Sequence, residues 1–212
     1  LFALPAETSH NLTLSALALC HKCHLTALIK KTNLDAPCQV MGLDFKNPVG
    51  LAAGLDKDGD YIDALAALGF GFVEVGTVTP QPQPGNSKPR MFRLAKANAI
   101  INRMGFNSKG LDYLLDRLAS RKKTVKLGIN IGKNLTTPVE QASQDYLTGL
   151  NRVYPFADYI TVNISSPNTP GLKDMQLRGR LENLIKSLNK VKKNNENLSA
   201  KSVLLKISPD LN

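Results

Sequence analysis

From about residue 48 onward, the chain alternates short apolar runs with segments whose apolar residues recur at helical spacing. The apolar runs are VGLAAG (49–54), FVEVG (72–76), KLGINIG (126–132), YITVNIS (159–165) and SVLLKIS (202–208). Between them, sets such as Leu111, Leu114, Leu115 and Leu118 repeat at i, i+3, i+4 and i+7, the pattern of one buried helix face. Apolar strands that alternate with amphipathic helices indicate parallel βα units.

Two architectures contain such units: an open doubly wound sheet and a (β/α)8 barrel, the TIM barrel. Polar side chains at or just past the strand ends help to choose between them; they are Lys57, Thr77, Asn130, Asn163 with Ser165 and Ser166, and Lys206. A barrel brings the carboxyl ends of its strands to one mouth, whereas an open sheet spreads them along an edge. The first strand is also not followed by a G-x-G-x-x-G motif. We therefore expect an α/β fold of the barrel class.

The number of strands limits this expectation. The sequence shows about five βα units in 212 residues, and a closed barrel needs eight. We expect the C-terminal part of the barrel to be missing, so that 37–212 form an incomplete barrel domain. The alternative is a complete but shorter open sheet.

Two further pieces precede the barrel. VMGLDFKNP (40–48) reads as a short hairpin that could plug the barrel floor. Residues 1–36 read as one or two short helices, apolar on one face but too short to span a bilayer. Such an extension suits a membrane surface or the entrance for an apolar ligand.

The string CHKCH (20–24) has the Cys-x-x-Cys-His spacing of covalent c-type haem attachment. A cytochrome-like carrier using Cys20, Cys23 and His24 is therefore one alternative function. However, three cysteines without an export signal suggest free thiols in a reducing cytoplasm, where such attachment is not expected. If the three residues share a helix face, a metal would still need ligands from elsewhere. We expect no metal site here.

Charge supplies the other alternative. The formal net charge of +10 would suit a basic module that binds nucleic acid. Aromatic residues make up only 6% and tryptophan is absent, so a surface for stacking bases is poorly supplied. The basic residues are also scattered, and nucleic acid is not expected as a partner.

The densest polar constellation is NISSPNTPG (163–171), where carboxamides and hydroxyls follow a strand and prolines restrict the backbone. NRMGFN (102–107) repeats the carboxamide chemistry, and AAGLDKDG (52–59) adds a lysine beside a glycine-rich turn. Each has a simpler interpretation: a turn for the first, a surface lysine with solvated Asp56 and Asp58 for the last, and a proline-rich connector for 77–90. The recurrence of matching groups at several strand ends favours a binding site.

Taken in order, six strings resemble the class 2, quinone-linked dihydroorotate dehydrogenases: MGLDFKNPVGLAAGLDKDG, GTVTPQPQPGN, KPRMFRL, INRMGFN, GINIGKN and NISSPNTPGL. The resemblance implies a barrel that holds FMN and oxidises dihydroorotate to orotate in pyrimidine (UMP) biosynthesis, with electrons passing to a membrane quinone. It implies a peripheral enzyme on the cytoplasmic face of the inner membrane. The serine at 166, where class 1 enzymes have cysteine, and the N-terminal extension both point to class 2.

The resemblance also implies roles for individual residues. Ser166 would be the base that removes the C5 proton as hydride leaves C6 for the flavin, with Thr169 as its relay. The implied substrate site comprises Lys57, Asn102, Arg103, Met104, Gly105, Phe106, Asn163 and Asn168. The implied FMN contacts are Ala53, Gly54, Leu55, Asp56, Lys57, Thr77, Asn130, Asn163 and Lys206. His10 and Arg93 match the polar groups of the quinone tunnel. The family's remaining flavin-phosphate and substrate groups fall beyond residue 212, so the chain should hold FMN poorly.

Overall fold

The computed structural model describes residues 3–28, 36–194 and 201–208. Its centre is a parallel sheet whose strands run in the order β3-β4-β7-β8-β9. These strands are β3 (Gly50–Leu51), β4 (Phe72–Val78), β7 (Lys126–Ile131), β8 (Tyr159–Asn163) and β9 (Ser202–Lys206). Each coincides with one of the five apolar runs, so the parallel α/β prediction is confirmed.

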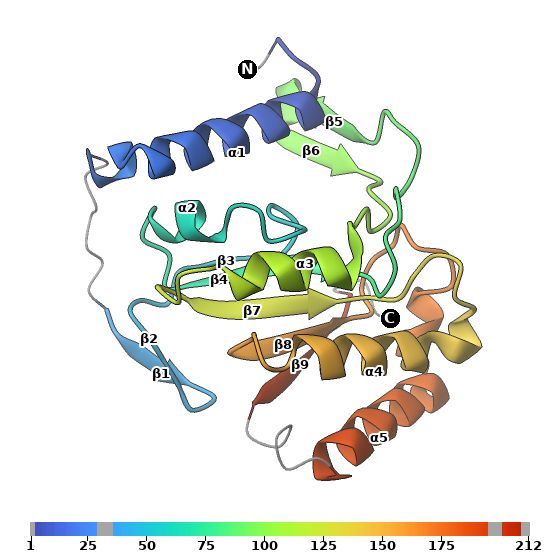
Figure 1. Ribbon diagram of the computed structural model, residues 1–212. Coiled ribbons are helices and arrows are strands. Elements are labelled where there is room, and N and C mark those ends of the chain that lie inside the picture. The colour runs from blue at the N-terminus through green and yellow to red at the C-terminus, as the bar shows by residue number, and fades with distance from the viewer. Residues whose placement is uncertain (1–2, 29–35, 195–200, 209–212) are drawn as a thin grey trace.

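Helices connect the strands and follow one another along the sheet (Figure 1). They are α2 (Ile62–Ala66), α3 (Gly110–Ala119), α4 (Ala142–Val153) and α5 (Arg178–Asn194), with short 3₁₀ turns η3 (Val139–Gln141) and η4 (Lys173–Gln176) before the last two. Leu111, Leu114 and Leu118 of α3 are buried, as their spacing predicts. Burial of each such leucine contributes roughly 1.5–3 kcal/mol, which fixes the helix on the sheet.

The predicted hairpin at 40–48 is present as β1 (Cys38–Val40) paired antiparallel with β2 (Leu43–Phe45). Its last residue, Phe45, meets the ring of Phe72 edge-on, with the centroids 5.4 Å apart. Phe72 in turn meets Tyr159, and these two rings begin β4 and β8. The hairpin therefore packs at the amino end of the sheet, where a barrel has its floor.

A second hairpin was not predicted. β5 (Met91–Leu94) pairs antiparallel with β6 (Ala99–Asn102) across the turn η2 (Ala95–Ala97). Its apolar side chains are largely exposed; Ile100 and Ile101 keep 63% and 54% of their surface. The sequences of the two strands, MFRL and AIIN, do not alternate apolar and polar residues, so they lack the pattern that marks a half-buried strand.

Over its described residues, the N-terminal extension contains one helix of 17 residues, α1 (Ala6–Lys22), and a 3₁₀ turn, η1 (Leu25–Leu28). Leu14 is buried in the common core, and α1 contacts α2 and β5 (Figure 1). Residues 29–35 of the predicted helical extension lie outside the described residues. Among the described helices, none has the length and apolar character needed to cross a membrane.

The residues of CHKCH do not share a helix face. The helix ends at Lys22, Cys23 caps it, and His24 has a left-handed backbone with φ of 59°. Cys20 and Cys23 are free thiols, and His24 is exposed. Among the described residues there is no cluster of three or more His, Cys, Asp or Glu suited to a metal.

Candidate functional site

Polar side chains from three neighbouring strands form a hydrogen-bonded row at the carboxyl end of the sheet. The hydroxyl of Thr77 on β4 donates to Asn130 Oδ1 on β7 over 2.6 Å, and Asn163 Nδ2 on β8 donates to Thr77 Oγ1 over 2.9 Å. All three side chains are buried. Buried polar groups are costly unless satisfied, so this row is held in one arrangement.

Glu74 extends the row toward the middle of the sheet. Its Oε1 accepts from Asn130 Nδ2 at 2.8 Å, and its Oε2 accepts from the hydroxyls of Tyr159 and Thr161 at 3.1 and 3.0 Å. Burial, and then the charge of Glu74, raise the pKa of Tyr159. Sequence reasoning missed this group, although one signal was available: a glutamate inside the apolar run FVEVG.

The loop after β8 continues from the row. Asn163 Oδ1 accepts from both the amide and the hydroxyl of Ser165, at 3.1 and 2.9 Å. Ser166 is half-buried, and its Oγ accepts from the Asn168 amide at 3.3 Å. Thr169 is buried, and its Oγ1 has no hydrogen-bond partner in the described part of the chain. The Ser166 hydroxyl is therefore half-buried and the Thr169 hydroxyl is buried, and the two are not hydrogen-bonded to each other.

The carboxamide segment 102–107 lies beside this loop. Asn168 Nδ2 donates to the carbonyl of Asn102 at 3.3 Å, which joins two of the predicted substrate residues. Gln83 Nε2 donates to the carbonyl of Phe106 at 2.8 Å, and Gly105 is buried next to it. The guanidinium of Arg103 points elsewhere, donating to the carbonyl of Pro89.

A hollow of about 290 Å³ brings other predicted residues together. Lys57 and Met104 of the predicted substrate site line it with His10 of the predicted quinone site, and Leu55 and Asp56 also contribute. Burial lowers the pKa of Lys57; burial, and then the charge of Lys57, lower the pKa of His10. Arg93 does not line this hollow; its guanidinium donates to the Leu4 carbonyl at 2.6 Å.

Asp56 and Asp58 are not the solvated turn residues of the simpler interpretation. The Asp56 carboxylate is buried and accepts from the amides of Asp60 and Tyr61 at 3.0 and 2.8 Å. Burial raises its pKa to about 6. Asp58 Oδ1 accepts from the Lys109 amide at 2.8 Å. Asp56 therefore organises the turn that leads into α2, and Asp58 ties this turn to the start of α3. Within the turn, Lys57 Nζ donates to the Gly54 carbonyl at 2.5 Å.

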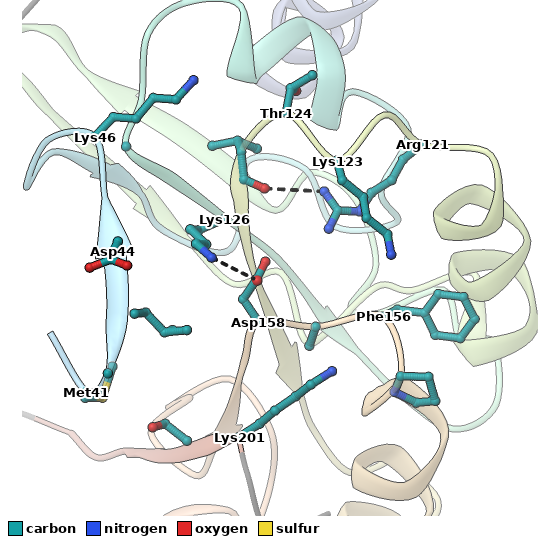
Figure 2. Close-up of a pocket in the computed structure, with 17 residues that line it drawn as sticks. Met41, Asp44, Lys46, Arg121, Lys123, Thr124, Lys126, Phe156, Asp158 and Lys201 are labelled. Carbon is teal, nitrogen blue, oxygen red and sulfur yellow. Dashed lines mark hydrogen bonds and ion pairs between the residues drawn. The ribbon is translucent and has the colours of Figure 1, made fainter. Parts of the chain in front are cut away.

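A larger hollow, of about 590 Å³, lies at the opposite, amino end of the strands (Figure 2). Lys126 and Asp158 form an ion pair at 3.6 Å there, with Arg121 and Lys201 nearby. None of the predicted site residues lines it. The functional site is therefore assigned by its polar groups and not by the size of the cavity.

Parallel βα units with polar side chains gathered at the carboxyl ends of the strands define a fold of the (β/α) barrel class. Residues 36–212 match the family model described as dihydroorotate dehydrogenase. The chain belongs to this family.

Individual relatives agree with the family. The chain is 54% identical to dihydroorotate dehydrogenase (quinone) of Cellvibrio japonicus and to that of Ectopseudomonas mendocina, over all of this chain and 62% and 63% of theirs. The crystal structure of the Eimeria tenella enzyme in complex with ferulenol superimposes with a TM-score of 0.82 at 39% identity, over 97% of this chain and 60% of that one. The chain thus spans about three fifths of the length of the relatives it matches.

Proposed function

We propose that this chain carries the active-site chemistry of a quinone-dependent dihydroorotate dehydrogenase of pyrimidine biosynthesis. Dihydroorotate would be oxidised to orotate, and the electrons would pass through FMN to a membrane quinone. The observation that carries the proposal is the buried row Thr77–Asn130–Asn163, joined to the loop of Ser166. It lies in a chain 54% identical to enzymes named for this reaction.

The residues at the strand ends fit FMN. Gly54 has a positive φ of 117°, and the position of a Cβ there has no atom within 4 Å, so the backbone at Ala53–Leu55 is open to a ligand. Thr77, Asn130 and Asn163 supply hydroxyl and carboxamide groups, and Lys206 is exposed at the end of β9. Bound FMN would supply a two-electron acceptor. Lys206 would supply positive charge to its electron-rich ring.

Lys57 and the carboxamides suit a planar, anionic substrate. A substrate carboxylate would stabilise the charged form of Lys57 and so offset the effect of burial. Asn102 is exposed, Asn163 ends β8 and Asn168 lies on the loop that follows, so their carboxamides would bind the ring's carbonyl and N–H groups. Arg103, Met104, Gly105 and Phe106 would shape this side of the site.

Ser166 is proposed as the base for the C5 proton. A serine hydroxyl is a weak base in water and needs an enclosed site and an acceptor for its own proton. Ser166 is half-buried, and the Thr169 hydroxyl in the same loop is buried with no hydrogen-bond partner among the described residues. These observations support Thr169 as the relay.

The extension, 1–36, is proposed to serve the quinone, and 37–212 to serve the chemistry. The match to the family model begins at residue 36, which supports this division. Leucines of the extension are exposed, at Leu12, Leu19, Leu25 and Leu28. An exposed apolar face supports peripheral contact with a membrane surface, proposed here as the cytoplasmic face of the inner membrane. His10 and Arg93 would border the quinone path.

One experiment tests the proposal. The purified full-length protein should show a flavin absorbance spectrum, and dihydroorotate should bleach it anaerobically with formation of orotate. A ubiquinone analogue should then restore the flavin spectrum. A haem spectrum would instead support the carrier based on Cys20, Cys23 and His24. A colourless protein that binds nucleic acid would support the basic module, and either result would overturn the proposal.

A further inference from the structure

Glu7 of α1 forms an ion pair with Arg90 that joins the extension to the barrel side of the molecule. Arg90 Nη2 lies 2.6 Å from Glu7 Oε1, and Arg90 Nε donates to both carboxylate oxygens at 3.2 Å. The Arg90 side chain keeps 7% of its surface exposed, and the Glu7 side chain keeps 18%. A pair that is this enclosed and makes several charge-assisted hydrogen bonds holds its partners in a defined geometry.

Arg90 also fixes the segment 84–90 in which it lies. Its Nη1 donates to the carbonyls of Pro84 at 2.6 Å and Asn86 at 3.1 Å. Nε and Nη2 bind Glu7, so the guanidinium is held by the carboxylate on one side and by the two carbonyls on the other. Through Arg90, a carboxylate on α1 therefore holds a loop that lies far from it in the sequence.

The segment 84–90 in turn holds the proposed substrate segment. Asn86 donates its amide to the Met104 carbonyl at 3.0 Å and its Nδ2 to the Arg103 carbonyl at 2.9 Å. The Asn86 carboxamide also packs on Gly105, where a Cβ would come within 2.7 Å of it. The Arg103 amide donates to the Arg90 carbonyl at 2.9 Å, which closes the connection.

The same asparagine reaches the loop of the proposed base. Asn86 Nδ2 lies 3.5 Å from the Asn168 carbonyl, and Asn168 Nδ2 donates to the Asn102 carbonyl. One set of hydrogen bonds thus runs from α1 through Arg90 and Asn86 to both halves of the proposed substrate site. It crosses the division between an extension for quinone and a barrel for dihydroorotate.

We propose that Glu7 is a positioning residue for the dihydroorotate side of the site: by holding Arg90, it sets the segment 84–90 and, through Asn86, the segments 102–105 and 165–171. The proposal rests on the proposed function for the identity of the ligand. Its structural content, the ordering of these two segments by a residue of α1, is independent of any ligand.

The test compares Glu7→Gln with two matched variants. Lys88→Gln removes another cation near Glu7, one that lies 3.6 Å away and keeps 68% of its side-chain surface. Leu14→Ala weakens the apolar docking of α1 without touching the ion pair. Hydrogen exchange in the ligand-free full-length protein is the first readout, and orotate affinity by calorimetry is the second.

In Glu7→Gln we expect faster exchange in peptides covering 84–90 and 165–172, and an orotate dissociation constant raised by about 3- to 30-fold. Lys88→Gln should match the unmodified protein, and Leu14→Ala should speed exchange in α1 more than in 165–172. Unchanged exchange in Glu7→Gln overturns the proposal, and so does an equal effect of Lys88→Gln or Leu14→Ala on 165–172. If the unmodified protein fails to bind orotate, the proposed function fails, and the exchange data still decide the role of Glu7.

Discussion

The hydroxyl of Thr77, at the end of β4, lies 2.6 Å from the carboxamide oxygen of Asn130 on β7, and both side chains are buried. The same hydroxyl accepts from Asn163 on β8. One small side chain therefore satisfies two carboxamides on two other strands. The arrangement of the proposed cofactor site depends on that hydroxyl.

Thr77→Val should lower stability and cofactor binding together. Valine keeps the shape but leaves Asn130 Oδ1 and Asn163 Nδ2 without this partner, at a cost of about 1–3 kcal/mol for each unsatisfied group. Urea denaturation of the protein measures the loss. Thr77→Ser keeps the hydroxyl and should lose clearly less; a Thr77→Val variant that is as stable as the unmodified protein, with the loss confined to Thr77→Ser, would show that the methyl group, and not the hydrogen bond, matters.

Ser166→Ala should slow reduction of the flavin by dihydroorotate by a factor on the order of 10²–10⁴, the range for removal of a general base. FMN content and orotate affinity should change little, since Lys57 and the carboxamides remain. Stopped-flow absorbance measures the rate. Ser166→Cys should recover part of it as the pH rises, because a thiol ionises far more readily than an alcohol. A normal rate in Ser166→Ala would place the base elsewhere.

Asp56 should make the protein less stable as the pH rises from about 4 to about 6. Its pKa is raised from 3.8 to about 6 in the folded state, so the folded state binds the proton more tightly than the unfolded state does. The contribution is fully present below pH 4 and is lost as the pH passes 6. It amounts to the order of 3 kcal/mol.

Asp56→Asn isolates this effect, because it removes the titration at one position. Urea midpoints measured between pH 4 and 7 should show a smaller decline in the variant than in the unmodified protein. Near neutral pH the variant should also lose one of the two backbone hydrogen bonds, since its amide group cannot accept from both Asp60 and Tyr61 as the ionised carboxylate does. Identical pH dependence in the two proteins would contradict the assignment.

Changing Cys20 and Cys23 together to Ser should leave cofactor content and turnover nearly unchanged. Both cysteines are free thiols. Because α1 ends at Lys22, Cys20, Cys23 and His24 do not lie on one helix face. Absorbance spectra and metal analysis of the purified variant check this. Loss of a bound cofactor or metal would show that CHKCH has a role.

Leu12→Glu with Leu19→Glu should weaken binding to anionic lipid vesicles in a sedimentation assay. Both leucines are more than half exposed on α1, and a charge there would remove apolar surface from the proposed contact with the membrane. Reduction of the flavin by dihydroorotate should stay the same. A matched change on α5, Lys186→Gln with Lys190→Gln, lowers the net charge by the same amount and controls for charge; equal weakening by both pairs would indicate general electrostatic attraction.

The sequence by itself determined the five strands, the helices between them and the hairpin at 40–48. These elements follow from the spacing of apolar residues over short stretches of sequence. The structure confirms the predicted helix face, since Leu111, Leu114 and Leu118 are buried in the core. The gathering of Thr77, Asn130 and Asn163 also followed from sequence, because parallel strands bring their carboxyl ends to one edge.

Tertiary structure alone decided which of these groups touch. Glu74 meets Tyr159 and Thr161 across 85 and 87 residues of chain, and Glu7 meets Arg90 across 83. The hairpin β5–β6 has no buried face to give its sequence a period. The local sequence allowed Asp56 to be a solvated turn residue. It is buried because other segments of the chain pack around it, and this burial raises its pKa. Contacts between distant segments depend on the packing of whole elements, and a local pattern does not carry that information.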